Sequence, residues 1–267
     1  RRRQQLLVVA AAGVQRAAAQ RARAVRRRNA AARRAAAGDR PGLAADGAAI
    51  VVNGRSDEAA IKAVAEEITA AGGRAMAYRA DITKPEEVAA MAAAVAAQFG
   101  GVDILVTNAG LRRQTSFLDM SFAEWREILS VALDGAFIIT QAFAQQMIAR
   151  GGGSIIGLSG ISTHVGTPNR AHVSASKSGL VGMARSFSRE LGSRGITANV
   201  VAPGFVETDM TAELDEKRRS EIAAQVPLGR FCSAQEIADV VTFIASAKAS
   251  YITGAIIPVD GGLGMGH

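Results

Sequence analysis

The stretch "AAIVVNGRSDEAAIKAVAEEITAAGGRAMAYRAD" (residues 48–81) places two strand-like segments on either side of one helix-like segment. It opens with a short apolar, β-branched run that ends in an asparagine–glycine turn signal. Its middle carries apolar residues at helical spacing, with Ser56 as the expected N-cap and a glycine pair at 72–73 as the stop. A strand, a helix and a second strand of these lengths predict a parallel βαβ unit.

The same alternation continues along the rest of the chain. Further strands are predicted at 102–110, 153–160, 196–204 and 255–262, and further helices at 84–101, 121–150, 170–195 and 233–246. This order predicts an α/β fold with a Rossmann-like doubly wound parallel sheet in a single domain. Ligands of such sheets bind beyond the carboxyl ends of the strands, so the loops that follow the strands are the candidates for function.

Charge is distributed unevenly along the 267 residues, which carry 31 basic and 24 acidic side chains. Residues 1–40 hold 12 arginines and one acid, a net charge of +11, which leaves 19 basic and 23 acidic residues and a net charge of −4 for the remainder. Only the basic segment could therefore favour a nucleic-acid partner, which we do not expect. We also expect no membrane-spanning stretch and no metal site.

The lone cysteine, Cys232, excludes an internal disulfide bond and favours a reducing compartment, so we expect a cytoplasmic protein. We interpret Cys232 as a small core residue rather than a nucleophile.

Residues 1–42 form an irregular Arg/Ala-rich segment that we separate from the domain at 43–267. Its arginines would fall all round a helix, and its only strand-like piece, 5–10, leaves open whether it supplies the first strand. A dinucleotide fold needs a glycine-rich turn, expected here near 29–36, but those residues contain no glycine. The segment is similar to an organelle transit peptide without its serines, or to a GC-rich coding region read in the wrong frame.

Six ordered motifs between about residues 43 and 264 resemble the short-chain dehydrogenase/reductase family. They are "ADI" (80–82), "DILVTNAG" (103–110), "SASK" (174–177), "NVVAPGFVETDM" (199–210), "GRF" with "EIADVVTFIAS" (229–246) and "YITGAIIPVDGG" (251–262). Members of this family move a hydride between NAD(P) and a carbonyl or alcohol carbon. The resemblance therefore implies an NAD(P)-dependent oxidoreductase.

The resemblance also implies which residues would contact the cofactor. The adenine, the ribose groups and the carboxamide would lie against Asp81, Ile82, Asn108, Ala109, Gly110, Lys177, Pro203, Gly204, Val206 and Thr208. Where NAD-binding members carry an acid, at the end of the second strand, this chain has Gly54 followed by Arg55. An arginine suits a 2′-phosphate, so NADP (NADPH) is the expected cofactor if one binds.

The catalytic positions of the family are largely replaced. The family places a tyrosine four residues before the lysine, a serine thirteen residues before that tyrosine, and an asparagine on the preceding long helix. Here these positions hold Val173, Gly160 and Ala132, so only Lys177 remains. The lysine normally lowers the pKa of the phenol, which then exchanges a proton. The resemblance thus implies a catalytically impaired protein, either a pseudoenzyme or an altered variant.

The alternative is an active NADP-dependent enzyme with an unusual proton donor, acting on a sugar acid or a 3-oxoacyl compound. His172 adjoins Val173 but is turned by roughly 100° around the helix. Other candidates for a role in the site, each with a plain surface or core role as the alternative, are Ser159, Ser162, His164, Arg112 and Arg113. The resemblance further implies a homodimer or homotetramer through helices 121–150 and 170–195, and a small carbonyl or sugar-acid ligand.

Overall fold

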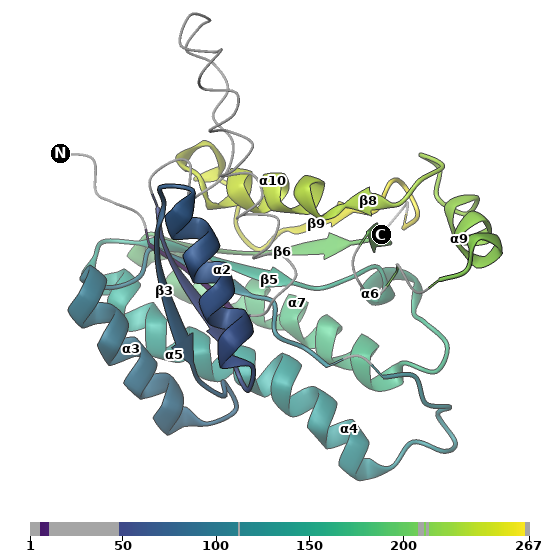
Figure 1. The fold of residues 1–267 in the computed structure, drawn as a ribbon, viewed down its shortest axis with the longest axis horizontal. Helices are drawn as coiled ribbons and strands as arrows, with labels where there is room; N and C mark the ends of the chain where they lie inside the picture. Colours follow the sequence, from purple (N-terminus) through teal and green to yellow (C-terminus); the bar gives the residue numbers. More distant parts are fainter. Residues whose placement is uncertain (1–5, 11–47, 112, 208–210, 212–213, 265–267) are drawn as a thin grey trace, which may run out of the picture.

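The computed structural model describes residues 6–10, 48–111, 113–207, 211 and 214–264, and it contains a seven-stranded parallel sheet (Figure 1). The strand order is β3-β2-β1-β4-β5-β6-β9. The strands are β1 (Leu6–Ala10), β2 (Ala49–Gly54), β3 (Arg74–Arg79), β4 (Ile104–Thr107), β5 (Gly153–Leu158), β6 (Ile196–Pro203) and β9 (Ile256–Val259). Because the order reverses between β1 and β4, the sheet is doubly wound, which confirms the predicted fold class.

The open question about the first strand is answered by β1. Its five residues pair in parallel with β2 on one side and with β4 on the other, with Leu7 opposite both Ile50 and Ile104. The strand-like piece at 5–10 therefore supplies the centre of the sheet. The expected glycine-rich turn at 29–36 lies outside the described residues.

The predicted helices are present with small shifts at their ends, and two further helices, α6 (Ser162–Val165) and α9 (Glu216–Ala223), were not predicted. The predicted ones are α2 (Glu58–Ala70), α3 (Pro85–Phe99), α4 (Phe122–Leu129), α5 (Gly135–Ala149), α7 (Ala171–Leu191) and α10 (Ala234–Ala245). The predicted N-cap Ser56 is wrong, because the Asp57 carboxylate accepts the hydrogen bond from the Ala60 amide at 2.8 Å. The short pair β7 (Val206–Glu207) and β8 (Cys232–Ser233) was beyond the reach of sequence patterns.

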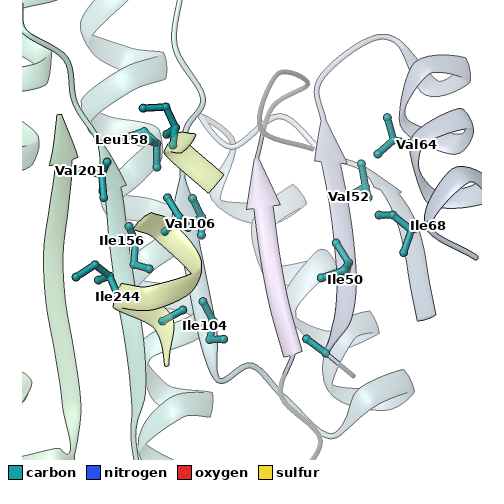
Figure 2. Close-up of a cluster of buried hydrophobic side chains, with 14 of the residues drawn as sticks. Ile50, Val52, Val64, Ile68, Ile104, Val106, Ile156, Leu158, Val201 and Ile244 are labelled. Atoms are coloured by element: carbon teal, nitrogen blue, oxygen red, sulfur yellow. The ribbon is translucent and has the colours of Figure 1, made fainter. Parts of the chain in front are cut away.

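Two layers of helices cover the sheet, and the alternation of side chains along the strands sorts the core between them. Ile50 and Val52 point to the layer formed by α2 and α10, where they join a cluster with Ile104, Val106 and Ile156 (Figure 2). The intervening residues of β2 point to the opposite layer, where they pack against buried side chains of α3 and α5. The carboxyl ends of the strands are thus held by a core on both faces.

The long helix predicted at 121–150 is one continuous helix with a π-helical segment, Ser130–Asp134, between α4 and α5. By length and composition alone, Phe122–Ala149 could cross a membrane, which corrects our expectation that no stretch would qualify. Three of its side chains, Ile139, Phe143 and Met147, are completely buried against the sheet. The helix is therefore a core helix of this domain.

Candidate functional site

Lys177 lies on α7 and reaches the carboxyl end of β5. Its Nζ donates a hydrogen bond to the main-chain carbonyl of Leu158, the last residue of that strand, at 2.6 Å. The contact joins helix to sheet across 19 residues of chain. The amine is therefore fixed at the edge of the sheet where ligands of doubly wound folds bind.

Two of the other predicted positions surround this amine. A Cβ atom built on Gly110, in the loop after β4, would lie 3.7 Å from Nζ of Lys177 and 3.9 Å from Cβ of Ala132. Ala132 is buried within the π-helical segment. The structure thus brings together Gly110, Ala132 and Lys177 from three separate elements.

The surroundings of Lys177 do little to stabilise its positive charge. Burial lowers the pKa of its amine to about 8, and no ion pair to it is found within the described part of the chain. Val173 precedes it by one helical turn on the same face of α7 and offers only methyl groups. The place where the family carries a phenol is therefore apolar here.

Gly160 follows the end of β5 and has open space beside it. A Cβ atom there would have only the Pro203 carbonyl oxygen at 3.9 Å and Ser162 Oγ at 4.0 Å as neighbours. A serine side chain would fit without displacing the backbone. Ser162 begins α6 rather than continuing the strand, yet its hydroxyl lies close to this empty position. Ser159 is buried and donates to Thr163 Oγ1 at 3.4 Å, so it serves the local fold.

His172 is completely buried and belongs to a structural network. Its Nδ1 accepts the Val173 amide at 2.9 Å, so its Nε2 carries the proton and donates to Glu124 Oε1 at 3.1 Å. Thr115 donates to the same oxygen at 2.6 Å, and the hydrogen bonds from Thr115 and from His172 lower the pKa of Glu124. His172 ties α7 to α4 and is not available as a proton donor on the face of Val173.

At the end of β2, an acidic side chain in place of Gly54 would have to displace the tip of the Ile61 side chain. A Cβ atom on Gly54 would lie 2.9 Å from Cδ1 of Ile61. Asn53 is buried beside it and donates to the carbonyls of Tyr78 and Ala80, each at 3.1 Å. Arg55 follows and is exposed, and so is Arg79, which pairs with Gly54 at the end of β3.

Asp81 and Ile82 follow β3 and have local partners. The Asp81 carboxylate accepts hydrogen bonds from the amide and the hydroxyl of Thr83, at 2.9 and 2.8 Å, and so shapes its own turn. Ile82 is only 6% exposed. It packs against Gly135, on which a Cβ atom would lie 2.7 Å from Cγ1 of Ile82. The side chain of Ile82 is therefore part of the core, although its main chain stands at the sheet edge.

The loops after β4 and β6 hold the remaining predicted cofactor contacts. Asn108 and Ala109 are half-buried next to exposed Gly110. The Gly204 amide donates to the Val259 carbonyl at 3.0 Å, and the Val206 carbonyl accepts from Thr211 at 2.9 Å. Pro203 ends β6, and Thr208 lies outside the described residues.

The other candidates mostly have ordinary roles. Arg113 forms a 2.7 Å ion pair with Glu127 on α4, and both side chains are exposed. Arg112 lies outside the described residues, and His164 is partly buried on α6. No cluster of three or more His, Cys, Asp or Glu side chains with metal-binding geometry occurs in the described segments.

A cavity of about 480 Å³ lies elsewhere along the carboxyl edge, and the sequence did not predict it. Its lining does not include Lys177. The lining is formed by the end of β9 and by the segments before and after α9, and it includes Phe205, Leu228, Arg230, Cys232 and Glu236. Burial and then the nearby Glu236 raise the pKa of the Cys232 thiol to about 11, so the thiol stays protonated. This agrees with the reading of Cys232 as unreactive.

Known proteins resemble the chain over most of its length. A family model described as enoyl-(acyl carrier protein) reductase matches residues 11–264. The 3-oxoacyl-(acyl-carrier-protein) reductase of Staphylococcus aureus is 41% identical over 223 residues, which cover 84% of this chain and 91% of that protein. The enzymes of the same name from Aquifex aeolicus and Escherichia coli are 41% identical over 222 residues and 40% identical over 223 residues. These matches cover 83% and 84% of this chain, and 89% and 90% of the respective relatives.

Proposed function

Because the chain belongs to the short-chain dehydrogenase/reductase family, we propose that it binds NADPH but reduces carbonyl compounds far more slowly than members with a full catalytic set. One observation carries this proposal. Lys177 is held at the carboxyl edge of the sheet, whereas Val173, Gly160 and Ala132 offer no exchangeable proton. We further propose that the protein acts in the cytoplasm as a homodimer or homotetramer.

The residues at the sheet edge fit NADPH better than NADH. NADPH would supply a hydride and carries a 2′-phosphate. The exposed guanidinium of Arg55 suits that phosphate, and Gly54 carries no carboxylate that would repel it. The Lys177 amine can donate hydrogen bonds to ribose hydroxyls.

The missing proton donor is what slows the reaction. When a carbonyl carbon accepts a hydride, its oxygen becomes an alkoxide that needs a proton. Valine cannot supply one, and His172 points to Glu124 instead. General acid catalysis contributes about 10²–10⁴-fold, so its loss predicts a rate reduced by a factor in that range.

A second candidate function is an active reductase of 3-oxoacyl thioesters. The identity of 40–41% to three enzymes named 3-oxoacyl-(acyl-carrier-protein) reductase favours this substrate class. An active enzyme would need a proton donor other than a tyrosine at position 173. NADPH oxidation by the unaltered protein with an acetoacetyl thioester separates the two candidates. Rapid turnover would contradict the proposal that the protein reduces carbonyl compounds slowly.

The decisive experiment restores the missing groups. We expect Val173→Tyr combined with Gly160→Ser to raise NADPH-dependent reduction of an acetoacetyl thioester by about 10²-fold or more. Gly160 has the space for a serine, since its nearest neighbours would be 3.9 Å from a Cβ atom. The matched control is Val173→Phe with Gly160→Ala, which adds the same bulk without either hydroxyl and should stay inactive.

Binding is measured on the same proteins so that turnover and affinity are separated. Quenching of the single tryptophan, Trp125, reports titrations with NADPH and with NADH in parallel. We expect saturable binding of NADPH in the unaltered protein and in both double variants. If no cofactor binds at millimolar concentration, the proposal fails at the binding step. If NADPH binds and the restored variant is no faster than its control, it fails at the chemistry.

A further inference from the structure

The immediate surroundings of the Lys177 amine contain no group that holds its positive charge. Its hydrogen-bond partner is the main-chain carbonyl of Leu158, at 2.6 Å. The side chains nearest to the Gly110 position beside it are Lys177 itself and Ala132, and Val173 occupies the preceding helical turn. No carboxylate pairs with this amine anywhere in the described ranges.

The hydrogen bond to Leu158 does not require a protonated amine. An ammonium has three N–H donors, and a neutral amine retains two of them together with a lone pair. Loss of the proton therefore leaves the contact with Leu158 in place. The lone pair becomes available on the side of the amine that faces away from β5.

Burial also leaves part of the Lys177 amine neutral, and therefore nucleophilic, near neutral pH. The lowered pKa of about 8 means that roughly a tenth of the amine is neutral at pH 7 and about half at pH 8. Lys177 nevertheless keeps part of its surface exposed, and the neighbouring Gly110 is exposed. Lysines desolvated in apolar surroundings are the ones that form Schiff bases with carbonyl compounds.

We propose that Lys177 is a reactive amine that condenses with small aldehydes and ketones at the carboxyl edge of the sheet. The amine nitrogen adds to the carbonyl carbon, a proton passes from nitrogen to oxygen, and the resulting carbinolamine loses water to give an imine. Nothing is oxidised or reduced, and water reverses the step. The proposal does not depend on hydride transfer, so it goes beyond the proposed function.

Reductive alkylation of the full chain tests this directly. The protein is treated with acetaldehyde and cyanoborohydride, which reduces the imine to a stable secondary amine, and the modified lysines are identified by peptide mass spectrometry. We expect Lys177 to react about tenfold or more faster than Lys62 at pH 8, with a half-maximal rate near pH 8. Lys62 is the internal reference, because its ion pair with Glu58 raises the pKa of its amine.

Two variants test whether the fast modification is specific to Lys177, and added NADPH tests whether the cofactor protects it. Lys177→Arg should abolish the fast modification while Lys62→Arg leaves it unchanged, and circular dichroism checks that both proteins are folded. Modification of Lys177 no faster than that of Lys62, or with a midpoint at or above pH 10, would overturn the proposal. NADPH is added in a separate arm: protection of Lys177 reports cofactor binding, and a lack of protection contradicts only the proposed function.

Discussion

Lys177 occupies its place because the local fold holds it there, not because a catalytic partner does. Its amine contacts Leu158 from a helix that is itself tied to α4 by buried His172 and Glu124. By the family resemblance, the positions that would exchange protons beside this amine hold Val173, Gly160 and Ala132. The fold therefore retains a lysine whose amine has a pKa lowered by burial.

That pKa predicts how stability depends on pH. The folded amine has a pKa of about 8 and the unfolded one about 10.5, so between these values the unfolded chain binds the extra proton. Raising the pH through this window therefore favours the folded state. Compared with Lys177→Met, the native chain should gain on the order of 1–3 kcal/mol of unfolding free energy between pH 8 and 10.5.

Urea unfolding at both ends of that window measures this gain. Lys62→Met is the matched control. Because Glu58 raises the pKa of Lys62, this lysine contributes no gain in unfolding free energy below pH 10.5, and its removal should leave the gain of the native chain unchanged. Equal pH dependence in Lys177→Met and the native chain would show that the amine is not perturbed in the folded state.

The site residues remain a prediction from motif spacing, whereas their surroundings come only from the structure. Motif spacing proposed Lys177 and the three replaced positions, and in the structure Gly110 lies next to both Lys177 and Ala132. The role of His172 could not be predicted, because its partner Glu124 is 48 residues away. A contact across that separation depends on how α4 and α7 pack, and no local pattern encodes it.

At the scale of elements, the strand and helix pattern was predictable because each segment obeys one period. The exceptions are places where tertiary contacts decide. The sequence "SVALD" (130–134) gives no sign of a π-helical turn, and β7 and β8 have two residues each. At the helix starts, Asp57 rather than Ser56 caps α2, and Ser233 caps α10 through a capping box with Glu236.

A pair of glycines tests how tightly the ends of β6 and β9 pack. Gly204→Ala should lower the unfolding free energy by about 1–3 kcal/mol, because the new Cβ would lie 2.8 Å from Cα of Asp260. Gly182→Ala, on exposed α7 surface with no atom within 4 Å, should instead add about 0.5–1 kcal/mol. Urea denaturation compares both with the native chain, and a loss for Gly182→Ala similar to that for Gly204→Ala would contradict this packing.

At the scale of the whole molecule, exposed aromatic rings mark the face on which we propose that a second copy docks. Phe122 on α4 and Phe137 on α5 are 76% and 46% exposed, and both lie on the helix through which the family resemblance implies assembly. Large exposed apolar side chains on one element favour an interface. A homodimer or homotetramer would cover them.

We therefore expect Phe137→Glu to reduce the native mass in solution, as measured by light scattering after size exclusion. A buried carboxylate on each subunit would oppose association. The matched control is Phe243→Glu, which is equally exposed at 45% but lies on α10, on the opposite face of the sheet. The control should still form at least a dimer, and an unchanged mass for Phe137→Glu would place the interface elsewhere.

The central position of β1 has a consequence for the timing of folding. Its two neighbours, β2 and β4, follow it in the chain, and the last residue of β4 is roughly 100 residues downstream. At a synthesis rate of about 5–20 residues per second, β1 waits about 5–20 s before both partners exist. During that delay the N–H and C=O groups along the edges of this apolar strand lack their strand partners and are open to chaperones or to strands of other chains. β1 is thus made before both of the strands that pair with it.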